Sequence, residues 1–289
     1  MVNHVQITKI KTFGLDSDSN TESFSKPQYQ LQWRNKMLIV NINSDFNMIN
    51  ATALKSDWWL TRCLQKSPIK LIRVPSEASE AEIRTWTIAA EKTDKKVFLH
   101  SASDLNLSRL QKTRAWKLKR LIDFVMAVLA LLILSPVAFA IAIKQKLAGK
   151  TILEKQLCVG KRGLVYRTFT WADIHSNSFG NRQILRLGLH KLPQLINVLR
   201  GEMTLVGYYP FSLDEALTLN TNQRKILNTV PGVLSITPWR SPSSDLRAIS
   251  NKSYNYFCNW SLYSDLKIIW LAVLRLFQGK SYSHQTAKL

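Results

Sequence analysis

A run of twenty residues without a charged side chain, from Phe124 to Ile143, dominates the hydrophobic pattern of this chain of 289 residues. At about 1.5 Å per residue, a helix of this length matches the hydrocarbon thickness of a bilayer. Ser135 and Pro136 interrupt the run, and an internal proline removes one backbone hydrogen bond and kinks a helix. The pattern therefore predicts a segment that is embedded in a membrane.

Basic residues flank both ends of this run. They are Lys112, Arg114, Lys117, Lys119 and Arg120 before it, and Lys144, Lys146 and Lys150 after it. Because Lys and Arg are enriched in cytoplasmic flanks, the charges favour both ends on the cytoplasmic side. A re-entrant helix-break-helix within residues 111–150 satisfies both the charges and the proline. A single spanning helix and a buried hairpin of a soluble protein are the alternatives.

Three short apolar runs precede the membrane segment, at residues 37–42, 69–74 and 96–100, and stretches of helical character separate them. This order predicts a small α/β region with a β-α-β-α-β layer over residues 37–110. No glycine-rich phosphate-binding pattern follows the first run, so we expect a regulatory or docking role for it. Residues 1–36 are polar and rich in Ser, and we predict a flexible arm there.

Charge and cysteine content narrow the function classes. The chain has 40 Lys and Arg against 19 Asp and Glu, a net charge of +21. Such an excess suits nucleic acid, an anionic bilayer or phosphorylated substrates. The absence of a recognised nucleic-acid motif and the apolar run in mid-chain argue against nucleic acid. The three cysteines lack disulfide or zinc spacing, which indicates a reducing compartment, and the first residues lack the apolar core of a signal peptide.

The most informative residues lie between residues 184 and 210. Leucines recur there near helical spacing, and Pro193 stands where a new helix ending at Gly201 would begin. His190 and Lys191 would then precede a helix N-terminus, where N–H groups and the helix dipole favour an anion. We expect a phosphate or diphosphate to bind here. The alternative is that both side chains are ordinary solvated polar groups.

Several motifs resemble one known family. Leu192 to Gly207 closely matches a LPQLxNVLxGxMxLVG pattern, and Gln156 with residues 159–163 matches a QxRxGxxG-like turn. The basic stretch Lys119 to Asp123, followed by Ser135-Pro136, matches the start of the family's re-entrant membrane hairpin. From about Lys117 to Ser283 the chain resembles the bacterial sugar transferases. These are polyprenyl-phosphate glycosyl-1-phosphate transferases of the monotopic phosphoglycosyl transferase superfamily.

The resemblance implies a mainly helical (α+β) monotopic membrane domain, with residues 151–289 at the cytoplasmic face of the bacterial inner membrane. It implies transfer of a sugar 1-phosphate from a nucleotide sugar to polyprenyl phosphate in exopolysaccharide or envelope polysaccharide synthesis. Other polysaccharide-assembly proteins are the implied partners. The substituted pair His190-Lys191 and the small α/β region also resemble types linked to cyanobacterial heterocyst envelope polysaccharide.

The family's chemistry depends on an Asp-Glu pair, and His190 and Lys191 stand at those two positions. In the family the Asp attacks the diphosphate and the Glu helps to hold Mg²⁺, whereas a lysine ammonium repels a metal. We therefore expect Mg²⁺ only if the chain is active, and we identify no metal ligand. Cys158 replaces the Arg of the QxR turn, and Tyr208-Tyr209-Pro210 replaces a Pro-Arg-Pro.

These substitutions are compatible with two functions. In one, His190 accepts the phosphoryl group and Lys191 neutralises charge. In the other, the chain is a pseudoenzyme that binds substrates or organises the assembly machinery. The residues that we expect to bind substrate are Lys161, Arg162, Arg186, Gln194, Tyr209 and Arg240.

The C-terminal stretch from Leu266 to Phe277 has apolar residues at helical spacing, which form one stripe with a basic rim. Such a stripe can pack against a core. It can also lie in the membrane interface, with Trp270 among the lipid headgroups.

Overall fold

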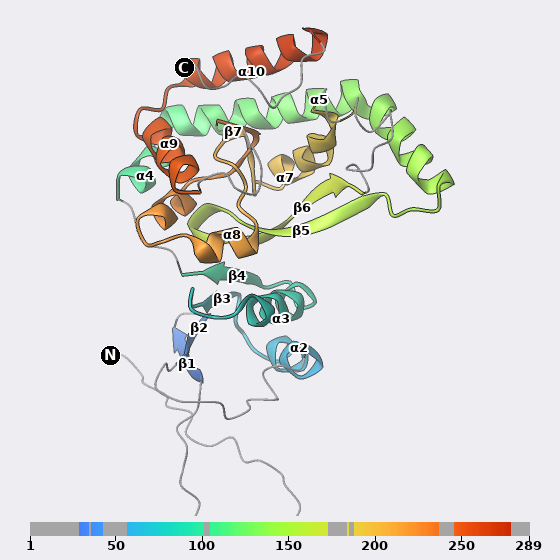
Figure 1. Cartoon of the computed structure of the whole chain (residues 1–289). Helices are drawn as coiled ribbons and strands as arrows, with labels where there is room; N and C mark the ends of the chain where they lie inside the picture. Colours follow the sequence, from blue (N-terminus) through green and yellow to red (C-terminus); the bar gives the residue numbers. More distant parts are fainter. Residues whose placement is uncertain are drawn as a thin grey trace, which may run out of the picture. The chain divides into compact units, whose positions relative to one another are not determined.

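The computed structural model describes residues 29–34, 36–42, 57–100, 105–172, 184, 188–236 and 246–278. The chain divides into two compact units, residues 1–100 and residues 101–289 (Figure 1). The boundary predicted at residue 110 therefore lies earlier, after His100. The reason is that helix α4 (Leu105–Leu110) buries Leu107 and packs with helix α9 (Leu246–Cys258) of the second unit.

The first unit has the predicted β-α-β-α-β order. Its elements are β2 (Met37–Ile42), α2 (Asp57–Gln65), β3 (Leu71–Val74), α3 (Glu80–Glu91) and β4 (Lys96–Leu99). The three strands are parallel neighbours, and alternate residues such as Leu38, Ile72 and Val97 are buried in register across them. The sequence predicts that this second helix starts at Ser76, but α3 begins later, at Glu80, because Ser79 and Glu82 form a capping box at its N-terminus.

One strand lies inside residues 1–36, the segment predicted to be a flexible arm. Strand β1 (Tyr29–Arg34) pairs antiparallel with β2 and completes a four-stranded sheet of order β1-β2-β3-β4. The signal for it is the alternation of Tyr29, Leu31 and Trp33 with glutamines, which is the period of a strand. The remainder of the predicted arm, residues 1–28, lies outside the described residues.

Helix α5 (Arg114–Leu147) contains the long apolar run. Its N-cap is Thr113, whose side chain accepts a hydrogen bond from the backbone N–H of Trp116. By length and composition it could cross a membrane, and only 11% of its most apolar window is buried. A helix with so little of its apolar surface covered is not the core helix of a soluble protein, which argues against the buried hairpin.

The structure differs from the predicted break at Ser135-Pro136, because α5 is one helix that continues through Pro136. Proline cannot donate to the carbonyl oxygen four residues before it, which belongs to Leu132. The Ser135 hydroxyl donates to that carbonyl instead, at 2.8 Å. The lost backbone bond is therefore replaced locally, and the ribbon changes direction in its C-terminal part without ending (Figure 1).

The second unit combines helices with two small sheets and so agrees with the predicted α+β class. Strands β5 (Leu153–Val159) and β6 (Val165–Trp171) are antiparallel, and β7 (Thr204–Gly207) and β8 (Gly232–Ser235) are parallel. The remaining elements are η1 (Lys161–Gly163), η2 (Leu189–Gln194), α7 (Leu195–Leu199), α8 (Leu213–Thr218), η3 (Gln223–Asn228) and α10 (Leu262–Gln278). Ala127 of α5 packs in one core with Leu195, Val198 and Val206.

Two glycines let β7 and β8 approach closely. A Cβ atom on Gly232 would lie 2.1 Å from the backbone nitrogen of Gly207.

We expect Gly232→Ala to lower the free energy of unfolding by about 3 kcal/mol, because the overlap is with backbone that must move. Chemical denaturation in detergent measures the change. In the control Gly149→Ala, nothing lies within 4 Å of the new atom, and its positive φ costs only about 1 kcal/mol. Equal stability of the two variants would contradict the prediction.

Candidate functional site

A cavity of about 190 Å³ lies between α5, η2, β8 and α10. Its wall is almost entirely apolar, with side chains from both long helices. These are Met126, Ala130 and Leu134 of α5, and Ile269, Ala272 and Val273 of α10. Met126 and Val273 are also exposed, so the cavity opens between two helices at an apolar surface. We call this cavity, with His190 and Lys191 in its wall, the dyad pocket.

His190 and Lys191 reach the pocket from a 3₁₀-helix. The sequence predicts that a helix begins at Pro193. In the structure Pro193 lies within η2, and helix α7 begins at Leu195. Helix α7 ends at Leu199 with Arg200 as its C-cap, and Gly201 follows at φ 81°, close to the predicted end. Since α7 has only five residues, the structure does not support the expected anion site at a helix N-terminus. Gln194 is buried at the junction of η2 and α7.

Lys191 places a cation in the wall of the dyad pocket. Its Nζ donates to the carbonyl oxygen of Val233, in β8, at 3.0 Å. The residue as a whole is half-buried, and burial of its ammonium lowers the pKa from 10.5 to about 8. Lys191 is therefore mostly protonated at neutral pH, although it lies among apolar side chains.

The described residues do not fit Mg²⁺ at this pocket. No carboxylate lines it, and no group of three or more His, Cys, Asp or Glu side chains comes together anywhere in the part of the chain that the structure describes. Mg²⁺ needs oxygen ligands, preferably carboxylates, and the Lys191 ammonium would repel it.

A second group of cations forms away from the dyad pocket. Lys161 and Arg162 lie in the η1 turn, and burial followed by the charges of Arg162 and Arg120 lowers the pKa of Lys161. Neither η1 residue lines the dyad pocket, so the structure does not bring these predicted substrate residues together with His190. The positive charges of Lys161, Arg162 and Arg120 therefore act on one another, and such a group of cations suits a phosphate.

The other predicted substrate residues are scattered. Tyr209 follows β7, packs edge-on against Phe211, and has a pKa that burial raises. It does not line the dyad pocket. Arg186 and Arg240 lie outside the described residues.

Cys158, at the position of the family's QxR arginine, is a buried neutral group. Its Sγ lies 3.5 Å from the Thr168 hydroxyl, and burial raises the pKa of the thiol to about 12. A thiol with this pKa does not ionise at neutral pH. The site therefore neither carries the positive charge of an arginine nor offers a reactive thiolate.

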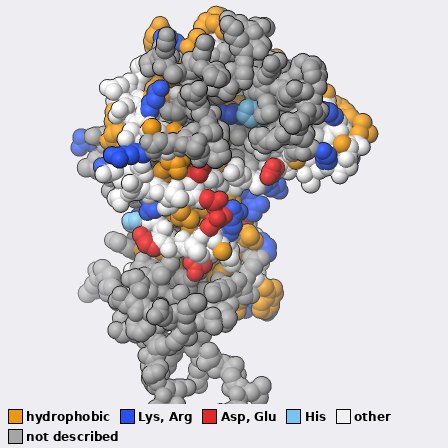
Figure 2. Space-filling view, in the orientation of Figure 1, with side chains coloured by type: hydrophobic (Ala, Val, Ile, Leu, Met, Phe, Trp, Pro, Cys, Tyr) orange, Lys and Arg blue, Asp and Glu red, His pale blue; other side chains and the backbone are white. Residues whose placement is uncertain are grey.

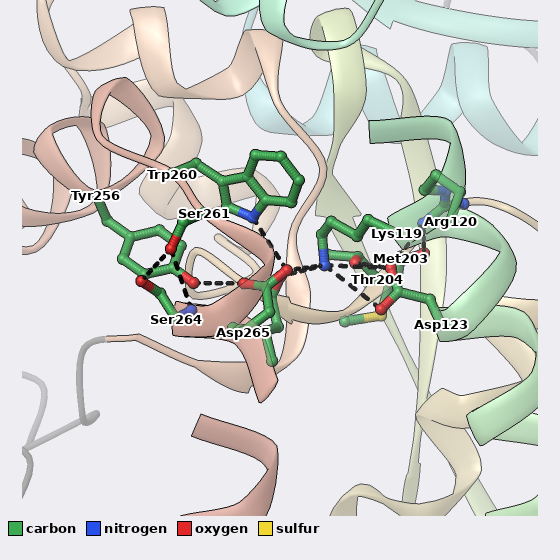
Figure 3. A network of polar contacts seen from close by, with 11 residues as sticks. Lys119, Arg120, Asp123, Met203, Thr204, Tyr256, Trp260, Ser261, Ser264 and Asp265 are labelled. Carbon is green, nitrogen blue, oxygen red and sulfur yellow. Dashed lines mark hydrogen bonds and ion pairs between the residues drawn. The ribbon is translucent and has the colours of Figure 1, made fainter. Parts of the chain in front are cut away.

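A buried network of charges next to α5 was not foreseen from the sequence (Figure 3). Lys119, predicted as a membrane flank, is only 1% exposed. Its Nζ lies 2.7 Å from Asp265 Oδ2 and 3.3 Å from Asp123 Oδ2. Arg120 donates to the carbonyl oxygens of Met203 and Gly201. Both predicted flank residues thus hold α5 to the protein, and Lys119 does not face the membrane surface.

Neutral donors complete this network. The Thr204 hydroxyl donates to Asp123 Oδ2, and the Tyr256 hydroxyl and Trp260 Nε1 donate to Asp265. Four elements, α5, β7, α9 and α10, therefore meet at one set of buried charges (Figure 3). Two features of the sequence point to this network. Lys119 and Asp123 have i, i+4 spacing, and one acid, Asp265, stands at the start of an apolar helix.

Helix α10 divides its apolar stripe between the core and the outside. Ile268 and Ile269 pack against the core cluster, whereas Leu266 and Val273 are exposed and Trp270 is 63% exposed. A purely core helix would not leave a tryptophan so exposed, so the structure favours an interfacial helix.

The far end of α5 presents apolar and cationic side chains together (Figure 2). Ile143 and Leu147 are exposed there, beside Lys144 and Lys146 in the last turn. Apolar surface bordered by cations is typical of contact with a membrane.

A model of the family described as bacterial sugar transferase matches residues 114–279, from the start of α5 to the end of α10. The chain is 27% identical over 192 residues to galactosyl transferase CpsE of Streptococcus agalactiae. It is 30% identical over 194 residues to an uncharacterized sugar transferase, EpsL, of Bacillus subtilis. It is 29% identical over 195 residues to the UDP-glucose:undecaprenyl-phosphate glucose-1-phosphate transferase of Escherichia coli.

The three alignments take in 56%, 59% and 57% of this chain, in the same order. They cover 42% and 41% of the streptococcal and E. coli proteins, so this chain spans less than half of their length, and 94% of the Bacillus protein. The first unit lies outside the family match. The names of these relatives do not refer to heterocysts, and that resemblance stays a prediction.

Proposed function

Because the chain belongs to the bacterial sugar transferase family, we propose that it transfers a sugar 1-phosphate from a nucleotide sugar to polyprenyl phosphate. The family match over residues 114–279 carries this proposal. The E. coli relative, a UDP-glucose:undecaprenyl-phosphate glucose-1-phosphate transferase, supports it. We place the reaction in exopolysaccharide or envelope polysaccharide synthesis, at the cytoplasmic face of the bacterial inner membrane, beside other polysaccharide-assembly proteins.

The position of the dyad pocket supports a lipid acceptor. Met126 and Val273 are exposed at its edge, so an isoprenoid chain would pass from the bilayer into the pocket without crossing polar surface. His190 and Lys191 in the wall then lie next to the phosphate head of that lipid. We propose Lys161, Arg162, Gln194 and Tyr209 as further substrate-binding residues, with the two η1 cations suited to the nucleotide's phosphates.

In the proposed reaction, His190 is the phosphoryl acceptor. A neutral imidazole nitrogen attacks the phosphorus that carries the sugar, and an N–P bond forms as the P–O bond to the nucleoside monophosphate breaks. An oxygen of polyprenyl phosphate then attacks the same phosphorus. The N–P bond breaks, the imidazole is regenerated, and the product is a polyprenyl diphosphate sugar. Lys191 stabilises the negative charge on the phosphoryl oxygens.

One observation favours a second function. The dyad pocket contains no carboxylate, and the Lys191 amine bonds to the backbone of β8. These features also suit a protein that binds the lipid or organises assembly partners without performing transfer itself.

A transfer assay separates the two functions. The purified full chain is incubated with undecaprenyl phosphate and labelled UDP-sugars, and lipid-linked product is measured. We expect product, and we expect His190→Ala to reduce its rate at least about a hundredfold, because the phosphoryl acceptor is lost. The matched control is His100→Ala, an exposed histidine of the first unit.

The outcomes are distinct. Lipid-linked product that is unaffected by His190→Ala would remove the role of that histidine while leaving the transferase. No product with any donor, from a protein that still binds the lipid, would favour the binding or scaffold function.

A further inference from the structure

The dyad pocket combines a single cation with apolar walls. Among its described lining residues, Lys191 carries a positive charge, His190 is the one other titratable side chain, and no lining side chain is acidic. An anion that leaves water for such a place must find a cation, because an unpaired buried charge is very costly. The pocket therefore selects for ligands that bring both a negative head and an apolar body.

We propose that the dyad pocket binds an amphiphilic anion, an aliphatic chain with one phosphate head, without a divalent cation, and that Lys191 supplies the positive charge. This inference rests on the proposed function and specifies how its lipid substrate is held. A divalent ion would have only backbone carbonyls as oxygen ligands among the described lining residues, and it would lie close to an ammonium. A single ammonium satisfies the head group with no such conflict.

The size and position of the dyad pocket indicate where the phosphate head and the aliphatic chain of the ligand would lie. About 190 Å³ accommodates the head and the first part of a chain only. The rest of the chain would lie along the exposed apolar face of α5, where Leu129, Leu132 and Ile133 face outward. A head group alone lacks the apolar contacts, and a neutral alcohol lacks the charge that pairs with Lys191.

Binding to the full chain in lipid nanodiscs tests this inference. The probes are dodecyl phosphate, dodecanol and inorganic phosphate, each measured by calorimetry in Mg²⁺ and in EDTA, with empty nanodiscs as the background. We expect dodecyl phosphate to bind with the same affinity in both buffers, and the other two probes to bind at least about tenfold more weakly. We expect Lys191→Met to weaken dodecyl phosphate binding at least about tenfold.

Two further variants make the test specific. Lys267→Met removes an exposed cation of α10 outside the pocket and should change affinity less than about twofold. Ala130→Phe fills the pocket without changing charge and should abolish binding. Circular dichroism verifies that each variant is folded.

Each result has one meaning. Binding of dodecyl phosphate that requires Mg²⁺ would overturn the inference. Binding that stays unchanged in both Lys191→Met and Ala130→Phe would also overturn it. Metal-independent binding by a protein that shows no sugar transfer would support it while rejecting the proposed transferase function. Sugar transfer together with Mg²⁺-dependent lipid binding would reject only the inference.

Discussion

Replacing Lys119 with methionine is expected to lower the free energy of unfolding by about 3–5 kcal/mol. The substitution leaves the carboxylates of Asp123 and Asp265 buried without the ammonium that lies between them. Hydrogen bonds from Thr204, Tyr256 and Trp260 remain. Arg120 Nη1 also remains, 3.9 Å from Asp123 Oδ2, but Asp265 is left with neutral donors, so the two buried negative charges are compensated only in part. Denaturant-induced unfolding in detergent, followed by circular dichroism, measures the loss.

Two comparisons separate lost pairing from lost packing. Lys117→Met removes an exposed charge two residues away and should change stability by less than about 0.5 kcal/mol. Adding Asp265→Asn to Lys119→Met removes one of the stranded charges and should recover part of the loss. If Lys119→Met unfolds like Lys117→Met, the network does not hold α5 to the rest of the second unit.

The network also shows what a sequence can and cannot predict. Lys119 and Asp123 are one helical turn apart, so their pairing is accessible from spacing. The third member, Asp265, lies in the last helix, and only the tertiary fold brings it to 2.7 Å from the lysine. For this reason the sequence indicates a cationic flank at the membrane surface, and the structure shows a buried ion pair.

Elements with a strong local period were predictable. The three parallel strands of the first unit follow from their short apolar runs, and the long apolar helix follows from its length. The dyad pocket was not predictable, because its walls come from α5, η2, β8 and α10. The sequence places His190 and Lys191 side by side, but the 3₁₀ conformation of η2 decides which apolar surfaces they contact.

The second large expected effect concerns which side of the membrane each end of α5 reaches. We propose that α5 enters and leaves on the same side, and therefore expect cysteines at positions 112 and 150 to be labelled from the same side of sealed vesicles. Basic residues flank both ends of the helix, and moving a cationic flank across a bilayer is unfavourable. The exposed native cysteines, Cys63 and Cys258, are first replaced by serine. Cys158 stays, because its buried thiol does not ionise.

Pro136→Leu is expected to convert part of the population to a spanning helix, in which only one of the two cysteines is labelled from a given side. Leucine restores a backbone N–H that can bond to the carbonyl oxygen of Leu132, which now accepts from the Ser135 hydroxyl. The helix would straighten, and its run of twenty residues without a charge, Phe124 to Ile143, matches the bilayer thickness. Val137→Leu, at the exposed next position, is the control that adds a similar side chain and keeps the proline. If the two cysteines of the unchanged α5 already react from opposite sides, α5 spans the membrane and the re-entrant proposal fails.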